Sequence, residues 1–459
     1  MTRERLRELL YAGINVPLSL VHGPGAVLPA LFAKEAGLSL VVIGSIMVGL
    51  RILDVVIDPL IGYWSDRSSS RFGRRKPWIV AGSVVVCAGA LLAFNPSANT
   101  GYWYFGLSIF LLVFGWSLVE TPYAAWLNEL TGDYHGRSRM ATQRVVAGYV
   151  GNAMFLALPL TGLFATTAMT PAVTAAGAWL VIGLFAVLLP PAMLMLGDAG
   201  ASKLERQSTA RDVLRSVRGN PAFWRYAAVQ GLSGLSSGIV SGLFFIWLDS
   251  YLQLGGKYSQ VMLPVMVCGF IGAIFWLRVT MGIDKHRVVS ACLLVTAATN
   301  LAMLFIAPGE WALAALIVSF AVSSFAGSGS TAAQTSLLAD TVDYGTLRTG
   351  IDHAGNYFAA ATFINKIAMS VGTGLGLVIA GLFGYTITGP NGTTAMNGFF
   401  IAIVFIPCAL NLLAAWVAWG FPIDRRRQRE IRAELDARAV GGHAVARRPP
   451  AAEGTAHAL

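Results

Sequence analysis

The sequence predicts an all-α membrane protein with twelve transmembrane helices in two six-helix halves. Of its 459 residues, 55% are hydrophobic and only 12% are charged, against roughly 25% charged in soluble domains. Apolar stretches of about 20 residues, long enough to cross a bilayer as helices, recur up to residue 421. This composition excludes a disordered chain, a disulfide scaffold and almost any soluble enzyme.

The apolar stretches place the spans in chain order. They are predicted at 11–33, 38–64, 77–96, 102–128, 143–165, 171–196, 222–252, 259–282, 288–307, 311–339, 353–386 and 394–421. The longest internal hydrophilic stretch, 197–221, lies between the sixth and seventh spans. It is predicted as a cytoplasmic linker between two bundles, 1–196 and 222–421. Residues 422–459, rich in Arg, Ala and Pro, are predicted as a partly disordered cytoplasmic tail. It is either a short helix along the membrane surface that fades into disorder or, as the composition favours, a solvated basic segment.

The basic residues predict the orientation. Lys34 and Lys257 fall in short loops on one side of the membrane, and Arg51, Arg144 and Lys366 fall inside spans. The other Lys and Arg residues fall in the termini and in the loops of the opposite side, so both termini are predicted to be cytoplasmic. The N-terminus runs into the first span without a small-residue cleavage site, so no cleavable signal peptide is expected. The high content of Ala, Gly and Arg is typical of bacterial proteins, so the protein is predicted to lie in the bacterial inner membrane.

Three charges lie close together in the second span. An ionised side chain at mid-membrane costs about 2.5–3.5 kcal/mol on insertion scales, so such a residue is retained when it has a charged partner or a function. Asp54 and Asp58 are four residues apart and share one helix face. Two carboxylates on an inward face form a cation site or a proton-sharing pair. Arg51 precedes Asp54 by three residues and can pair with it, and a purely structural charge network is the alternative.

Further charges in other spans provide partners. Glu120 in the fourth span and Arg144 in the fifth are predicted to neutralise each other, unless Arg144 is a span-end residue that extends to the membrane surface. Lys366 lies well inside the eleventh span and requires an acid, and the acids of the first half are the nearest candidates across a central cavity. Asp340, Asp343 and Tyr344 end the tenth span and are predicted as a gate with ion pairs across the halves.

The loop between the second and third spans carries a motif. It reads G-x-x-x-D-R-x-x-x-R-x-G-R-R from Gly62 and resembles the signature of the major facilitator superfamily, which implies that fold. An aspartate here can pair with basic groups, and the arginines can tie the loop to helix ends. A gating or structural role is predicted for the charged residues of this motif, for the arginine of the second span and for the cluster that ends the tenth span. These residues are Arg51, Asp66, Arg67, Arg71, Arg74, Arg75, Asp340, Asp343 and Tyr344.

Several segments together resemble the glycoside–pentoside–hexuronide:cation symporter family of that superfamily. They are R-I-x-D-x-x-x-D-P-x-x-G (51–62), R-x-G-R-x-K-P-W (71–78), an acid-x-P-aromatic element (120–123), Arg144, D-x-V-D-Y-G (340–345), Thr362 and Lys366. The resemblance implies a cation site formed by Asp54, Asp58, Ser117 and Glu120. It implies that Arg144 is the sugar-binding arginine, that Thr362 is a cavity residue and that Lys366 is the charged residue of the eleventh span. The full set predicted to bind substrate is Arg144, Thr331, Gln334, Thr362 and Lys366.

The chain departs from this family pattern in its sugar site. The family's sugar-binding acid on the first span falls near Leu18 or Ser19, and neither is acidic. Its sugar-stacking Trp on the fourth span falls at Ala124, and another cavity Trp on the tenth span falls at Thr331. The family's Asn between the paired acids falls at Ile57. Its loss removes one oxygen ligand, which weakens the case for Na+ and favours H+ as the alternative coupling ion. Lysophospholipid symporters also belong to this family, so a substrate other than a sugar stays open.

These observations predict a secondary active transporter that couples entry of a sugar or glycoside-like solute to a cation by alternating access. The alternative is a proton-coupled exporter, or a transporter of a lipid or drug-like amphiphile. An enzyme is not expected, because the hydroxyl-bearing stretch 327–330 has no His in register with it. The four Cys lie in apolar stretches without a CxxC pair, so no metal site is expected beyond transported Na+. No prosthetic cofactor, nucleic acid or obligate protein partner is expected, and the partners are the solute and the bilayer.

Overall fold

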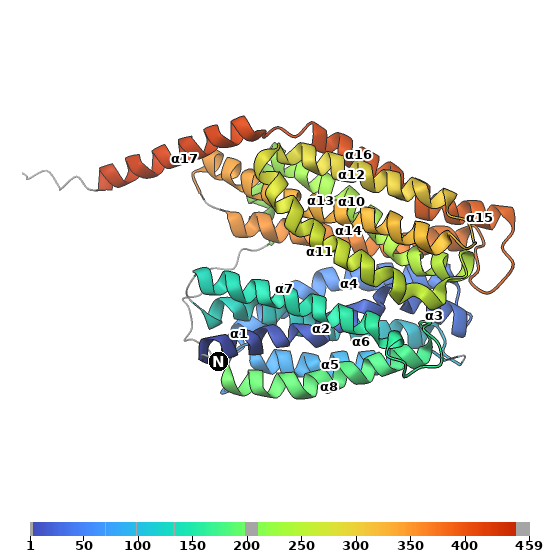
Figure 1. The fold of residues 1–459 in the computed structure, drawn as a ribbon. Helices are drawn as coiled ribbons and strands as arrows, with labels where there is room; N and C mark the ends of the chain where they lie inside the picture. The colour runs from blue at the N-terminus through green and yellow to red at the C-terminus, as the bar shows by residue number, and fades with distance from the viewer. Residues whose placement is uncertain are drawn as a thin grey trace, which may run out of the picture.

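The computed structural model describes residues 3–68, 70–97, 99–131, 134–197, 210–351 and 353–446. All regular structure in these ranges is helical, and Figure 1 shows the helices running side by side in two bundles. The first bundle contains α1 (Arg3–Gly13), α2 (Asn15–His22), α3 (Leu28–Glu35), α4 (Leu40–Arg67), α5 (Lys76–Ala93), α6 (Tyr102–Leu130), α7 (Tyr134–Ala157) and α8 (Pro171–Met195). The second contains α10 (Pro221–Ile246), α11 (Tyr258–Gly282), α12 (Lys285–Ala302), α13 (Ala312–Thr349), α14 (Ala354–Leu382), α15 (Thr393–Phe400) and α16 (Ile406–Trp419). The short α9 (Ala210–Arg218) precedes the second bundle, and α17 (Arg425–Ala446) follows it.

Ten helices within the described ranges are long and apolar enough to cross a membrane, or eleven when the bent segment from α1 to α3 is counted as one span. The remaining predicted span, 143–165, corresponds to α7, which starts earlier and ends earlier than expected. Its sequence includes Arg137, Arg139, Gln143 and Arg144, so it lacks a continuous apolar stretch. It packs along α1 and α2 of the first bundle (Figure 1), and Arg139 and Arg144 on it pair with acids of that bundle.

The first predicted span, 11–33, is not one continuous helix. It bends by 50° between α2 and α3, and a short 3₁₀ turn, Gly23–Ala26, fills the break. Pro24 has no backbone N–H to donate within a helix. Gly23 packs against Phe155, whose Cδ1 would lie 2.6 Å from any added Cβ. The break directly follows a polar residue, His22, which ends α2.

The tenth span is longer than predicted. Helix α13 continues past residue 339 to Thr349 and ends at Gly350, whose φ of +71° is the left-handed conformation that glycine adopts readily. The sequence 340–345 is therefore helical rather than part of a loop.

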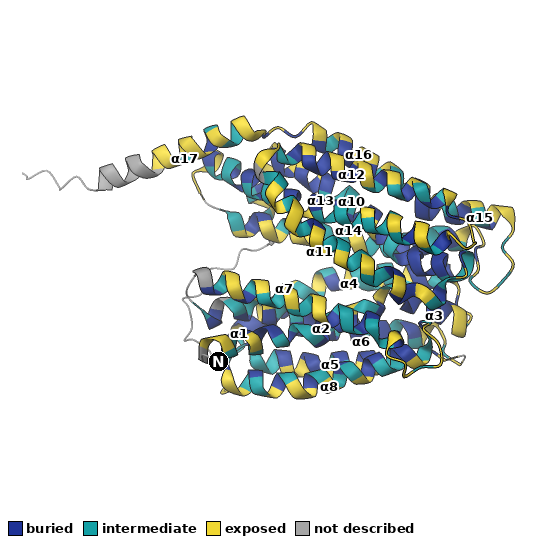
Figure 2. Cartoon of the chain, viewed as in Figure 1, coloured by how far each residue is buried: buried dark blue, intermediate teal, exposed yellow. Residues whose placement is uncertain are grey.

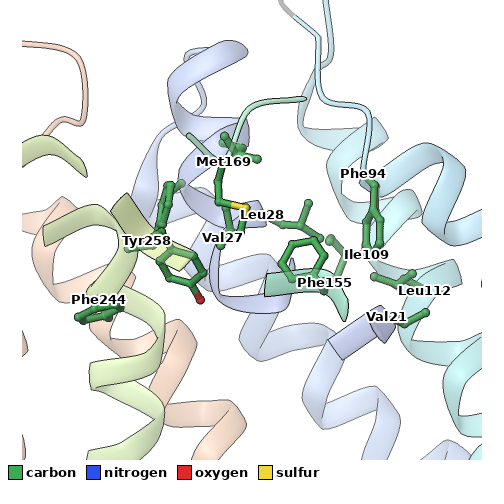
Figure 3. Packing of buried hydrophobic residues seen from close by; sticks show 14 of the residues in the cluster. Val21, Val27, Leu28, Phe94, Ile109, Leu112, Phe155, Met169, Phe244 and Tyr258 are labelled. Atoms are coloured by element: carbon green, nitrogen blue, oxygen red, sulfur yellow. The ribbon is translucent and has the colours of Figure 1, made fainter. Parts of the chain in front are cut away.

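Apolar packing joins the two bundles at the end opposite the described termini. Figure 3 shows Val27 and Met169 of the first bundle close to Tyr258 and Phe244 of the second, and all four belong to one cluster of buried hydrophobic residues. Figure 2 shows exposed residues along the outer faces of both bundles. Large apolar side chains such as Trp179 (65% exposed) and Trp416 (74% exposed) lie there, as expected for surfaces that contact lipid.

Candidate functional site

The charges of the second span meet the lysine of the eleventh span where α4, α6 and α14 come together. Lys366 Nζ lies 2.7 Å from Asp54 Oδ2 and also pairs with Asp58. Ser117 on α6 donates a hydrogen bond of 2.9 Å to the other Asp54 oxygen, and Arg51 Nη1 lies 3.6 Å from the same residue. The expected link between Lys366 and acids of the first half is therefore present in the structure.

The second acid–base pair lies between α6 and α7. Arg144 is hydrogen-bonded to Glu120, and its guanidinium carbon lies 4.5 Å from the centre of the Tyr123 ring. Tyr123 in turn donates its hydroxyl to the Tyr11 carbonyl at 2.7 Å, and Asn15 donates to the Arg144 carbonyl at 2.8 Å. Arg144 thus points inward to an acid and does not extend to the membrane surface.

The four residues predicted as one cation site are divided between these two pairs. Asp54, Asp58 and Ser117 lie around Lys366. Glu120 instead binds Arg144, and its interaction with Lys366 and Asp58 is electrostatic and longer-range. Asp58 Oδ1 is buried and accepts no hydrogen bond from the described residues. In those residues no group of three or more His, Cys, Asp and Glu side chains is arranged to hold a metal ion. A cation site formed by all four residues therefore stays a prediction, and it requires their side chains to be arranged differently.

The main cavity, with a volume of about 890 Å³, is lined by residues of both bundles. Its polar side chains come mainly from two helix faces, Asn15, Ser19 and His22 on α2, and Ser324, Ser328 and Thr331 on α13. The described side chains that line it include no Asp, Glu, Lys or Arg. Sequence reasoning missed five of these six residues, although the i, i+4, i+7 spacing on each helix marks a shared face.

Of the residues predicted to bind substrate, Thr331 lies on the wall of this cavity. Gln334 is buried one turn away and donates to Ser330 Oγ at 2.9 Å. Lys366 lines a smaller cleft of about 240 Å³ together with Arg51 and Asp54. Thr362 is exposed one turn before Lys366 on α14, and neither it nor Arg144 lines the main cavity.

The motif between α4 and α5 forms a buried ion-pair network. Arg75 pairs with Asp66 and, through Nε, with Glu129 of α6 at 3.0 Å, and it donates to Ser65 Oγ at 2.8 Å. Arg74 binds the same glutamate at 3.0 Å. The pairing of the aspartate with a basic residue was expected, but Glu129 was missed, because its partners lie more than 50 residues earlier in the chain.

The other two motif arginines stack on neighbouring rings rather than binding helix ends. The guanidinium of Arg67 lies 3.6 Å from the centre of the Tyr63 ring, and that of Arg71 lies 4.7 Å from the centre of the Phe72 ring.

The tenth-span acids do not pair across the halves in the described part of the chain. Asp340 pairs with Lys285 of α12 at 2.7 Å, and Asp343 pairs with Arg432 of α17 at 3.4 Å. The extended α13 carries both acids beside these two helices, so the expectation of pairs between the halves is wrong for them. Tyr344 lies on the same helix under the guanidinium of Arg348, 5.8 Å from its ring centre.

The comparisons with known proteins cover most of the chain. Residues 18–425 match the family model described as MFS/sugar transport protein. A glucuronide carrier protein homolog of Escherichia coli is 21% identical over 89% of this chain and 90% of its own length. A putative glycoside/cation symporter of E. coli, YagG, is 24% identical over 76% of each chain. A lactose permease of Lactobacillus delbrueckii subsp. bulgaricus is 22% identical over 81% of this chain and 62% of its own length.

Solved structures share the fold at low identity. The nucleoside transporter NupG superposes with a TM-score of 0.63 at 14% identity, over 90% of this chain and 98% of that one. A bacterial homolog of the human lysosomal transporter Spinster superposes with a TM-score of 0.64 at 12% identity, over 91% of this chain and 98% of that one.

Proposed function

Since the chain belongs to the MFS/sugar transport protein family, we propose that it carries a sugar or glycoside across the membrane together with a cation, by alternating access. It is an integral membrane transporter and not an enzyme. The relatives are named as carriers of glucuronides, glycosides and lactose, and the main cavity, lined by amides, hydroxyls and an imidazole, suits a polyhydroxylated solute of this kind.

The observation that carries the coupling proposal is the sharing of Lys366 by Asp54 and Asp58. The lysine comes from one half and the acids from the other, so their interaction depends on how the halves are arranged. Together Arg51, Arg144 and Lys366 balance Asp54, Asp58 and Glu120. A cation that binds the two aspartates competes with the lysine ammonium for the same oxygens, and the unpartnered oxygen of Asp58 is the first available ligand.

Alternating access follows when cation and solute stabilise the same arrangement of the halves. The coupling ion is Na+ or H+, since an aspartate pair accepts either. The halves, residues 1–196 and 222–421, rock about the cavity and are joined by the cytoplasmic linker 197–221. The protein resides in the inner membrane of a bacterium with both termini in the cytoplasm, consistent with its distribution of basic residues.

The test is uptake into proteoliposomes of labelled lactose, methyl β-D-xyloside and p-nitrophenyl β-D-glucuronide, with a sodium gradient or a proton gradient imposed separately. Uptake of one solute driven by one of the two gradients is expected. Asp58→Asn should abolish the gradient-driven component, whereas Glu310→Gln, which removes an exposed acid in a loop, should leave it unchanged. If folded wild-type protein transports none of the three, the sugar assignment fails.

A further inference from the structure

His22 occupies an unusual place in the first bundle. It is the last residue of α2, directly before the 3₁₀ turn Gly23–Ala26 and the bend to α3. Its side chain is exposed, and the cavity of about 890 Å³ includes it in its wall. It also lines a second, smaller cavity of about 80 Å³ that reaches Arg51 and Trp116. The imidazole therefore stands at the junction between the main cavity and the charge cluster.

The ring of His22 is held in place but has no polar partner. Trp116 packs against it edge-on, with ring centres 4.8 Å apart and an interplanar angle of 89°. No hydrogen bond or ion pair joins the imidazole to any other residue in the described part of the chain. A neutral imidazole offers one donor and one acceptor, so both are available to a molecule in the cavity.

Several other polar groups on the cavity wall are already committed to the protein. Asn15 donates to the Arg144 carbonyl at 2.8 Å. Ser328 and Thr331 donate their hydroxyl protons to carbonyls of their own helix, at 2.7 Å and 3.0 Å. These hydroxyls can still accept a hydrogen bond but cannot donate a second one. The Ser19 and Ser324 hydroxyls also line this cavity, but His22 lies in the wall of the second cavity as well, so it is placed to bind a solute hydroxyl on the side of Arg51 and Trp116.

The same helix offers no carboxylate for this role. Leu18, one of the two positions at which the family resemblance places a sugar-binding acid, is buried with 1% exposure. Ser19 lies on the cavity wall but is neutral. We infer that His22 is a substrate-recognition residue that hydrogen-bonds a hydroxyl of the transported solute through its free ring nitrogens. This inference rests on the proposed function, because it takes the cavity to be the solute site.

The inference is tested with His22→Ala, His22→Gln and His353→Ala in proteoliposomes, with the best-transported solute among lactose, methyl β-D-xyloside and p-nitrophenyl β-D-glucuronide as probe. Loss of one neutral hydrogen bond should raise KM about five- to tenfold in His22→Ala, with Vmax within about twofold. His22→Gln, which keeps a donor and an acceptor, should recover most of the affinity. His353→Ala changes a histidine outside the cavity and should leave KM unchanged.

Deoxy analogues of the same probe distinguish direct contact from a structural role. One deoxy position should raise KM about five- to tenfold for wild type and not at all for His22→Ala, because the paired group is already missing. The inference is overturned if His22→Ala keeps the wild-type KM, or if it still discriminates against every deoxy analogue as wild type does. Absence of uptake of all three probes by folded wild type instead refutes the sugar assignment, and this inference with it.

Discussion

Lys366 shows how single charges are made tolerable inside this bundle. Its ammonium lies between two carboxylates, and the indole of Trp116 lies 5.6 Å from it as a further electrostatic neighbour. Desolvation of such groups is offset only when each has its partners in place, so removal of one member leaves an uncompensated buried charge. Asp54 is the most dependent member, because it is 3% exposed and binds Lys366, Ser117 and Arg51.

Replacement of Lys366 by Gln should therefore destabilise the protein by about 1–3 kcal/mol, below the full value for a completely buried pair because the lysine is 28% exposed. The measurement is the thermal unfolding midpoint in detergent at neutral pH. Adding Asp58→Asn to Lys366→Gln should recover part of the loss, since the unpaired negative charge is removed as well. Lys257→Gln, at an exposed lysine, should not change the midpoint. Equal midpoints for Lys366→Gln and wild type would show that the pair contributes nothing to stability.

The sequence predicted these pairings because an isolated charge in an apolar span requires a partner of opposite sign. It predicted the Glu120–Arg144 pair, but it did not predict which acids of the first half bind Lys366, because that choice depends on how closely α4, α6 and α14 approach. It also missed His22 as a cavity residue. The Gly23–Pro24–Gly25 break that exposes it is short, and the surrounding residues are as apolar as an intact span.

At the scale of elements, close helix contacts at glycines determine where the halves meet. Gly44 of α4 and Gly374 of α14 face each other, and a Cβ on Gly374 would lie 2.7 Å from the Gly44 carbonyl oxygen. Gly381 lies further along α14, where a Cβ would lie 2.8 Å from the backbone nitrogen of Val41. The contact thus requires residues without side chains. It lies toward the same end of the bundles as the apolar cluster shared by the two halves.

Gly374→Val should separate α4 from α14 and lower gradient-driven uptake by about tenfold or more, since overpacking costs about 1–3 kcal/mol. Gly49→Val is the matched control on α4, because nothing lies within 4 Å of a Cβ at that position, and it should transport normally. Uptake and the monodispersity of each purified variant are measured together. A properly folded Gly374→Val protein with wild-type uptake would contradict this account of the contact.

The network around Arg75 joins three elements of the first bundle, since it links the end of α4 to the start of α5 and to α6. Arg75→Lys should destabilise the protein by about 1–3 kcal/mol, because a lysine cannot bind Asp66, Ser65 and Glu129 with the same planar geometry. The unfolding midpoint measures this loss. Arg71→Lys is the control, because its side chain only stacks on Phe72 at the surface. Comparable midpoints for the two variants would mean that the network is not a stabilising contact.

At the scale of the whole molecule, the halves are closed at one end. Lys34 on α3 pairs with Asp249 of the second half at 2.8 Å, and Thr167 donates to the Gly256 carbonyl at 2.7 Å. Both contacts lie at the end opposite the described termini, near the apolar cluster of Figure 3. A transporter that alternates must break these contacts once in each cycle, so each of them has to be weak.

The Lys34–Asp249 pair meets that requirement, because its side chains are 44% and 18% exposed and exposed ion pairs contribute about 0–1 kcal/mol. Lys34→Gln should therefore raise the fraction of molecules that are open at this end by at most about fivefold, without unfolding the protein. Spin labels on either side of this end, read as a distance distribution by pulsed EPR, measure that population. The exchanged variant Lys34→Asp with Asp249→Lys should return the distribution toward wild type, whereas Glu35→Gln, the adjacent exposed acid, should leave it unchanged. If Lys34→Gln leaves the distribution as it is, the glycine contact and the apolar cluster hold this end closed by themselves, and the ion pair only follows their movement.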